Sequence, residues 1–188
     1  MLFKEDEPCR NVISLLSGEV KLTSTSSRGR TFILKVAHPG DLLGLTAAIT
    51  RSRYEVTAES LVPAIIRTIP RDDFFSFVER HREVHMHLAR LLAEDCKSAF
   101  VNVRNIVYSS AAERIATILL NWGRSPLHPE ARLRFDITLT HDELGSLAGV
   151  SRETVSRVLS EFQRKKLIAI HGTSVLILEP VRFASLIA

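Results

Sequence analysis

The segment 140–165 constrains the fold more than any other part of the chain, because it encodes two helix starts with one short turn between them. Thr140 and Glu143 form the pattern of a capping box, in which each residue satisfies a backbone N–H of the other. Gly149 lies where a tight turn needs a residue that tolerates a positive φ. Ser151 is a favourable N-cap for a second helix. The segment therefore predicts two short helices joined at a sharp angle.

The second of these helices is predicted to have one apolar and one polar face. Val155, Leu159 and Phe162 follow the i, i+4, i+7 spacing of a buried helix face. The exposed N-terminal end carries side chains that bond to base edges, since Arg pairs with guanine, Glu accepts from cytosine, and Ser bonds to several bases. These candidate base-contacting residues are Arg152, Glu153, Ser156 and Arg157.

Basic residues and a predicted β-hairpin follow the second helix. Lys165 and Lys166 suit contact with DNA phosphates. Apolar segments 167–170 and 175–178 flank the turn 171–174, as the strands of a wing do. An isolated Arg-Glu pair at a helix start is usually only solvated. The complete order of capping box, glycine turn, polar helix end, basic residues and hairpin is instead typical of a winged helix-turn-helix, and it predicts DNA binding.

The segment 140–159 closely resembles the helix-turn-helix signature of the Crp-Fnr (catabolite activator) superfamily of bacterial transcription regulators. The resemblance extends to segments 112–116, 167–172, 15–20 and 39–44, and so covers almost the whole chain. It implies an α+β fold with three parts. These are an N-terminal cyclic-nucleotide-binding-like β-roll (a jelly roll), a long dimerisation helix and a C-terminal winged helix-turn-helix.

The same resemblance implies a homodimer that binds palindromic sites in double-stranded DNA, with half-sites about 34 to 36 Å apart. RNA polymerase is implied as a further partner if the protein activates transcription. By position, the resemblance assigns base contacts to Arg152, Glu153 and Arg157, and to Ser156 as in the Fnr-like branch. It assigns phosphate contacts to Thr140, Ser151, Thr154 and His171.

The first third of the chain is predicted to form short β-strands over residues 12–16, 20–25, 31–36, 54–58 and 64–69. Turn residues at 17–18, 26–29 and 39–41 separate them, which favours a small barrel or jelly roll. A cupin-like enzyme is the rival interpretation from another class. Cupin chemistry needs several His and a Glu inside the barrel, but residues 10–70 contain only His38. The protein is therefore predicted not to be an enzyme.

A short helix is expected after Pro70, and a long helix over residues 83–107, where no Gly or Pro occurs. Spacings of 4, 3, 4, 3 and 4 within it predict a heptad seam between two copies of the chain. That seam consists of Leu88, Leu92, Asp95, Ala99, Asn102 and Ile106. The alternative is a monomeric helix that lies on the barrel.

Beyond the long helix, the pattern predicts a helix over 111–122, a loop over 125–130 and a strand over 133–137. The expected domains are therefore a β-roll sensor over 1–82, a dimerisation helix over 83–108 and a winged helix-turn-helix over 109–188.

Two departures from the family pattern concern the effector. Cyclic-nucleotide binders of the family carry Gly-Glu and a later Arg-Ser or Arg-Thr, whereas this chain has Gly44-Leu45 and Arg53-Tyr54. The iron-sulfur branch needs clustered N-terminal cysteines, and only Cys9 is available there. We therefore expect neither cyclic AMP nor an iron-sulfur cluster, and predict no cofactor. An unknown small-molecule effector, or a nucleotide in a rearranged pocket, stays open.

Composition sets broad limits only. The formal net charge of +4 permits binding to a polyanion but does not identify one. No apolar run is long enough to cross a bilayer, and the start lacks the features of a secretory signal, so the expected location is the cytoplasm, without a membrane partner. His81, His85 and His87 have no supporting ligand cluster, so no metal is predicted.

Overall fold

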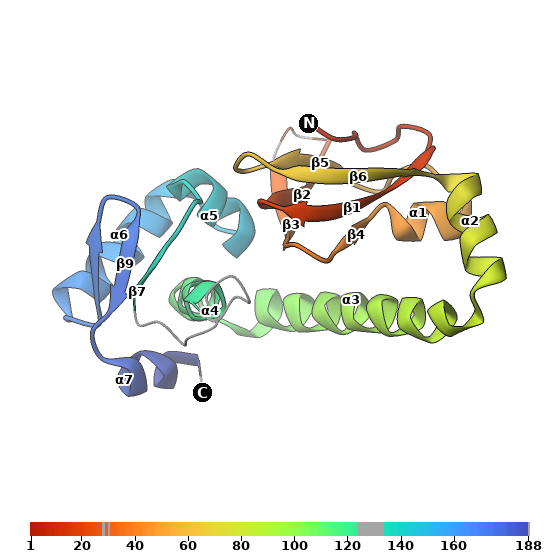
Figure 1. Cartoon of the computed structure of the whole chain (residues 1–188). Helices are drawn as coiled ribbons and strands as arrows, with labels where there is room; N and C mark the ends of the chain where they lie inside the picture. Colours follow the sequence, from red (N-terminus) through yellow and green to blue (C-terminus); the bar gives the residue numbers. More distant parts are fainter. Residues whose placement is uncertain (28, 30, 124–133, 188) are drawn as a thin grey trace. The chain divides into compact units, whose positions relative to one another are not determined.

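The computed structural model describes residues 1–27, 29, 31–123 and 134–187 (Figure 1). The chain divides into two compact units, Met1–Val101 and Asn102–Ala188. The division falls within the long helix α3 (Arg82–Tyr108). The boundaries expected after residues 82 and 108 stay predictions.

The first unit is the predicted β-roll. Its elements are β1 (Asn11–Ser17), β2 (Val20–Thr25), β3 (Thr31–Ala37), β4 (Leu42–Leu43), α1 (Leu45–Thr50), β5 (Thr57–Ser60), β6 (Ile65–Pro70), α2 (Arg71–Arg80) and the first part of α3. One antiparallel sheet has the strand order β4-β1-β6, and another has the order β3-β2-β5. Val12, Leu15 and Val20 are fully buried in the core of the roll, as expected for apolar positions on short strands.

The part of the roll between β4 and β5 differs from the prediction. A strand was predicted over 54–58, but β5 begins at Thr57. Tyr54 is a core residue outside the strand, because its ring stacks on Phe3 at 3.9 Å and its hydroxyl donates to the Asn11 carbonyl at 2.7 Å. The short helix α1 was not predicted, because six residues give too little periodicity to identify a helix.

Both predicted helices after Pro70 are present. Helix α2 buries Phe74 and carries acidic residues in its first turn, which stabilises a helix N-terminus. Helix α3 runs two residues beyond the predicted bounds in total, and its buried residue Leu88 belongs to the core of the roll. Val84 and Leu92 pack partly buried against the same core.

The second unit combines helices with a three-stranded antiparallel sheet of order β7-β9-β8. After α3, its elements are α4 (Ala111–Gly123), β7 (Arg134–Asp136), α5 (His141–Ala148), α6 (Arg152–Arg164), β8 (Ile168–His171), β9 (Ser174–Ile177), α7 (Pro180–Ala184) and a 3-10 turn (Ser185–Ile187). Helix α4, both short helices and the wing strands confirm the sequence prediction. The predicted loop 125–130, residue 133 of the predicted strand and residue 28 of a predicted turn lie outside the described residues.

The core of the second unit joins its helices to the wing. Ile115 of α4, Val155 of α6 and Val175 of β9 are almost completely buried. Phe162 and Phe183 meet edge to face with their ring centroids 5.3 Å apart, which fixes α7 against α6. None of the described helices combines the length and the apolar character that crossing a bilayer requires.

Candidate nucleic-acid interface

The start of α5 is fixed by the predicted capping box. The Glu143 N–H donates to Thr140 Oγ1 at 3.2 Å, and the Thr140 N–H donates to Glu143 Oε2 at 3.0 Å. Two backbone donors that have no partner within the helix are thereby satisfied. The helix-turn-helix therefore begins at the residue that the sequence predicted.

The turn between α5 and α6 depends on two glycines. Gly149 has a φ of 66°, in the left-handed region that favours glycine, and its N–H donates to the Gly145 carbonyl. At Gly145 a Cβ atom would lie 2.8 Å from the Val150 carbonyl oxygen, which is closer than any real Cβ contact. Gly145 therefore permits the close approach of α5 to the turn, a role that its place in the sequence did not reveal.

Helix α6 presents its polar end because its other face is firmly buried. Ser151 caps the helix by accepting from the Thr154 N–H at 3.3 Å. The predicted inner residues Val155, Leu159 and Phe162 are all buried, and Val158 joins them. This packing leaves the first two turns of α6 open on the opposite side.

The four candidate base-contacting residues lie on that open end. Arg152, Glu153 and Arg157 are exposed, and Ser156 is half-buried. The pKa of Glu153 lies below its ordinary value because backbone and Ser151 hydrogen bonds at the helix start stabilise its carboxylate. The end of α6 thus offers two guanidinium groups, one carboxylate and one hydroxyl, which together can donate to and accept from base edges.

The candidate phosphate-contacting residues lie at helix ends and in the wing. Thr140, Ser151 and His171 are exposed, and Thr154 is half-buried. The Thr140 hydroxyl accepts a capping hydrogen bond and donates to Glu143 Oε2 at 2.9 Å, and the Ser151 hydroxyl accepts from the Thr154 N–H and lies 3.3 Å from Thr154 Oγ1. Each hydroxyl therefore has to exchange a partner within the protein to donate to a phosphate. Helix N-termini of this kind are suited to phosphate, since free N–H groups and the helix dipole both favour an anion.

The two lysines after α6 differ in their surroundings. Lys165 Nζ lies 2.6 Å from Glu161 Oε1, one helical turn earlier, and this lysine holds the pKa of Glu161 below its ordinary value. Lys166 is exposed and adopts a positive φ of 55° as the chain leaves the helix. Next to them, β8 and β9 pair in register from Ile168↔Ile177 to His171↔Ser174 and form the predicted wing.

One contact in this region was not predicted. Nδ1 of His141, the first residue of α5, lies 3.0 Å from Oγ of Ser156 on α6. A second connection joins α4 to the end of α5, where Arg114 Nε donates to the Ala148 carbonyl at 2.7 Å. Neither has a local sequence signal, because each joins residues that are more than ten positions apart.

The six positions of the predicted seam on α3 differ in their surroundings. Leu88 is buried in the core of the β-roll, Leu92 packs against that core, and Asp95 forms an ion pair with Lys35 of β3. These three positions therefore contact the roll of their own chain; Leu88 is buried there, Leu92 is half-buried and Asp95 keeps an exposed side chain. The other three predicted positions, Ala99, Asn102 and Ile106, are exposed.

An exposed apolar face lies one residue further along the same helix. Shifting every predicted position by one residue, which rotates it about 100° around the helix axis, gives a set without a polar side chain. We call this set the shifted seam: Ala89, Ala93, Cys96, Phe100, Val103 and Val107. All six are exposed, and the exposed fractions reach 72% for Phe100, 61% for Val103 and 65% for Val107.

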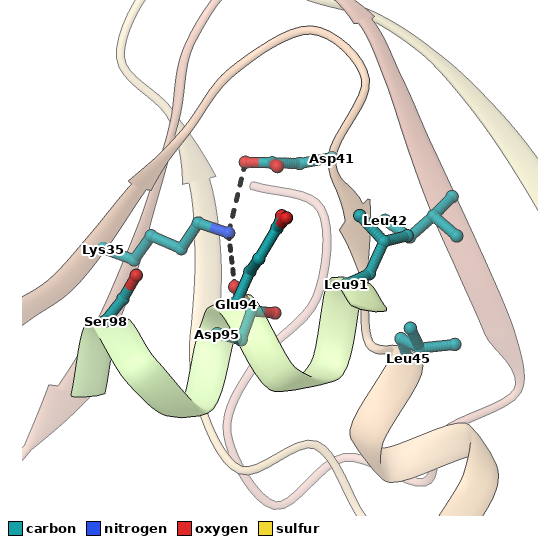
Figure 2. A pocket seen from close by; sticks show the side chains of 8 residues that line it. All are labelled: Lys35, Asp41, Leu42, Leu45, Leu91, Glu94, Asp95 and Ser98. Atoms are coloured by element: carbon teal, nitrogen blue, oxygen red, sulfur yellow. Dashed lines mark hydrogen bonds and ion pairs between the residues drawn. The ribbon is translucent and has the colours of Figure 1, made fainter. Parts of the chain in front are cut away.

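The first unit also contains a small pocket of about 160 Å³, shown in Figure 2. It is lined by Lys35, Asp41, Leu42, Leu45, Leu91, Glu94, Asp95 and Ser98. Lys35 Nζ extends between two carboxylates and lies 2.8 Å from Asp95 Oδ1 and 3.3 Å from Asp41 Oδ2 (Figure 2). Burial disfavours the charged lysine, but the two carboxylates outweigh it, so the pKa of Lys35 lies above its ordinary value.

The two family positions expected to differ from cyclic-nucleotide binders lie in the interior of the roll. Leu45 is 4% exposed and Tyr54 is 5% exposed. The neighbouring Arg53 donates to the backbone carbonyl of Asp6. Burial raises the pKa of Tyr54 to about 12. These side chains are used for packing and internal hydrogen bonds.

The histidines considered as metal ligands do not gather in the structure. His81 Nδ1 lies 3.2 Å from Glu83 Oε1, and His85 and His87 are exposed. Among residues 1–27, 29, 31–123 and 134–187, no three His, Cys, Asp or Glu side chains form a group that could hold a metal ion.

Comparison with known proteins agrees with this architecture. A Crp-like helix-turn-helix domain model matches residues 113–186, and a cyclic nucleotide-binding domain model matches residues 1–81. The chain is 28% identical to the CRP-like cAMP-activated global transcriptional regulator of Mycobacterium tuberculosis, over 97% of this chain and 82% of that protein. It is also 28% identical to the transcriptional activator protein anr of Pseudomonas aeruginosa, over 98% of this chain and 76% of that protein.

Solved structures share the fold. FixK2 from Bradyrhizobium japonicum superposes with a TM-score of 0.87 at 24% identity, over 100% of this chain and 92% of that chain. A CRP family transcriptional regulator from Thermus thermophilus gives a TM-score of 0.82 at 23% identity, over 99% of this chain and 92% of that chain. The fold and the interface define a DNA-binding transcription regulator with a winged helix-turn-helix. With both domain matches in the expected order, the chain belongs to the Crp-Fnr superfamily.

Proposed function

We propose that this regulator binds an inverted-repeat DNA site as a homodimer, with the N-terminal end of α6 in the major groove of each half-site. The observation that carries the proposal is the open, polar end of a helix whose other face is buried. Arg152, Glu153, Ser156 and Arg157 contact base edges there. Positions that differ in hydrogen-bonding chemistry along one helix end can discriminate several neighbouring base pairs.

A second set of residues holds the protein on the backbone of the DNA without discriminating sequence. The set consists of Thr140, Ser151, Thr154, Lys165, Lys166 and His171. For Lys165, phosphate contact competes with the Glu161 ion pair, which is partly exposed and therefore weak. Binding should weaken as salt rises, because each phosphate that is neutralised releases counterions.

The homodimer forms through the shifted seam on α3. Three large apolar side chains, Phe100, Val103 and Val107, are more than half exposed and follow heptad spacing. A second copy of the same helix is the occupant that supplies an equal apolar face by two-fold symmetry. Such a dimer presents two α6 helices, as an inverted repeat requires.

Cyclic AMP is not the effector of this regulator. The pocket is about half the size of the smallest typical ligand site, about 300 Å³. Its charged lining, Lys35 with Asp41, Glu94 and Asp95, has a formal charge of −2, which repels a phosphate. The Mycobacterium relative is named as cAMP-activated, so the difference is testable. We expect no change in melting temperature with cyclic AMP, and a rise of several degrees would contradict the proposal.

Other features of the proposal follow from the family. Cys9 is buried and Cys96 is exposed, and two cysteines are too few for the four thiolates of a typical cluster, so we propose no iron-sulfur cluster and no cofactor. We propose that an unidentified small-molecule effector or a partner protein controls the activity of the regulator. A cytoplasmic location suits DNA binding, and RNA polymerase is the expected partner if the regulator activates transcription. No enzymatic activity is proposed, since the named relatives are transcriptional regulators.

Selection of bound DNA from a random pool tests the proposed function. The expected product is an inverted repeat whose half-site centres are about one helical turn, 34 to 36 Å, apart. Enrichment of a single half-site would contradict the dimer, and absence of any enriched sequence would contradict base contact by α6.

A further inference from the structure

The contact between His141 and Ser156 connects two helices at the proposed DNA-binding surface. His141 is the first residue of α5 and is exposed, while Ser156 lies in the second turn of α6 beside Arg157. The His141 Nδ1 to Ser156 Oγ distance of 3.0 Å is that of a hydrogen bond. A serine hydroxyl has one proton and two lone pairs, so this bond determines what Ser156 has left to offer a base.

The protonation state of His141 decides whether the hydroxyl proton of Ser156 is available to DNA. In a neutral imidazole with its proton on Nε2, Nδ1 accepts the Ser156 hydroxyl proton, and Ser156 Oγ can then only accept from DNA. In the major groove the matching donors are the amino groups of adenine and cytosine. A doubly protonated imidazole instead donates from Nδ1 to Oγ. The hydroxyl proton of Ser156 is then free to bond to guanine O6 or N7, thymine O4 or adenine N7, while the second lone pair can still accept from an amino group.

We propose that His141 is a positioning residue that sets the base preference of Ser156: it limits Ser156 to accepting when Nδ1 is unprotonated, and it frees the hydroxyl proton of Ser156 for DNA when the imidazole is doubly protonated. The inference rests on the proposed base contact of Ser156. The change in preference follows from a proton added to His141 and needs no movement of either helix.

The two helices that form this contact, and helix α4 packed against both, carry several charged groups. On α5 they are Asp142 and Glu143, and Glu143 is engaged in the capping box. Within one turn of Ser156 on α6 they are Arg152, Glu153 and Arg157. On α4, which packs against both helices, they are Glu113 and Arg114.

The test measures base preference at two pH values. The base pair contacted by Ser156 is first identified as the one whose preference the Ser156→Ala variant loses. Dissociation constants are then measured by fluorescence anisotropy at about pH 8 and pH 5.5 for duplexes that differ only at that pair. For the unmodified protein we expect the preference for adenine or cytosine over guanine or thymine to fall about three- to tenfold in acid, the size of one neutral hydrogen bond.

Three variants separate this role from a structural one. His141→Phe keeps a ring but frees the Ser156 hydroxyl, so it should show the acid preference at both pH values. His141→Asn can accept through its side-chain oxygen, so it should restore the preference seen at pH 8 and hold it at both. His171→Phe, the matched control in the wing, should change affinity for all sequences and keep the pH-dependent preference.

The outcomes separate the base contact of Ser156 from the role of His141. If Ser156→Ala loses no base preference at any position, the proposed base contact fails, and the inference fails with it. If Ser156→Ala loses a preference but the unmodified protein has the same preference at both pH values, only the role of His141 is overturned.

Discussion

The shifted seam on α3 makes a quantitative prediction for the variant Phe100→Ala. Full burial of a phenylalanine side chain is worth about 1.5 to 3 kcal/mol. Since 72% of Phe100 is exposed, its burial in a dimer contributes about 1 to 2 kcal/mol for each copy. In a homodimer the substitution removes the ring from both copies, so the free energy of dimerisation should weaken by about 2 to 4 kcal/mol. That corresponds to a dimer Kd about 30- to 700-fold higher.

The assay is sedimentation equilibrium over a range of protein concentrations. Ile106→Ala is the matched control, because Ile106 is 47% exposed on the same helix but lies outside the shifted seam. The control should alter the dimer Kd by less than about threefold, and circular dichroism should show that both variants fold. A Phe100→Ala variant that dimerises like the unmodified protein, with weakening in Ile106→Ala instead, would refute the shifted seam and restore the originally predicted one.

Three further predictions concern DNA contact and stability. Arg157→Ala should abolish preference at one base pair of each half-site, whereas Lys165→Ala should weaken binding to all sequences and reduce the salt dependence. Ser151→Ala removes the α6 cap and should lower the free energy of unfolding of the free protein by about 1 kcal/mol in urea titration. Between pH 10 and 12 the free energy of unfolding should fall less steeply in Tyr54→Phe, because an unfolded tyrosine ionises near pH 10 and Tyr54 only at about 12.

Each of these predictions has an outcome that would contradict it. If Arg157→Ala and Lys165→Ala each lost the same affinity for specific as for random DNA, the proposed distinction between base contact by Arg157 and phosphate contact by Lys165 would be wrong. Ser160→Ala, in the middle of α6, is the control for the cap, and a similar loss there would argue against a capping role. For Tyr54 the sign is fixed, since a pKa raised in the folded state stabilises below pH 10 and loses that contribution by pH 12. If the free energy of unfolding fell equally steeply with pH in Tyr54→Phe and in the unmodified protein, the raised pKa of Tyr54 would be contradicted.

The sequence was most informative where local interactions determine the structure. The capping box at Thr140, the left-handed turn at Gly149 and the N-cap at Ser151 each depend on neighbours within a few residues, and all three are confirmed. The buried positions of α6 were likewise predictable from the spacing of its apolar residues.

Contacts between distant segments were beyond such signals. Tyr54 is held by Phe3 and Asn11, and His141 by Ser156, and none of these pairs is recognisable without the fold. On α3 two adjacent faces follow heptad spacing; Leu88 and Leu92 of one pack against the β-roll, whereas the shifted seam is exposed throughout. Heptad spacing alone cannot tell which of the two faces meets a second copy. The absence of polar residues from the shifted seam is a sequence signal that favours the shifted seam as the dimer contact.

Methylation interference on the selected site tests the central claim most directly, because guanine N7 lies in the major groove that α6 is proposed to enter. The account predicts that methylation of guanine N7 blocks binding in two patches, related by two-fold symmetry and centred about 34 to 36 Å apart. Interference confined to adenine N3 in the minor groove, or none at any guanine N7, would contradict it.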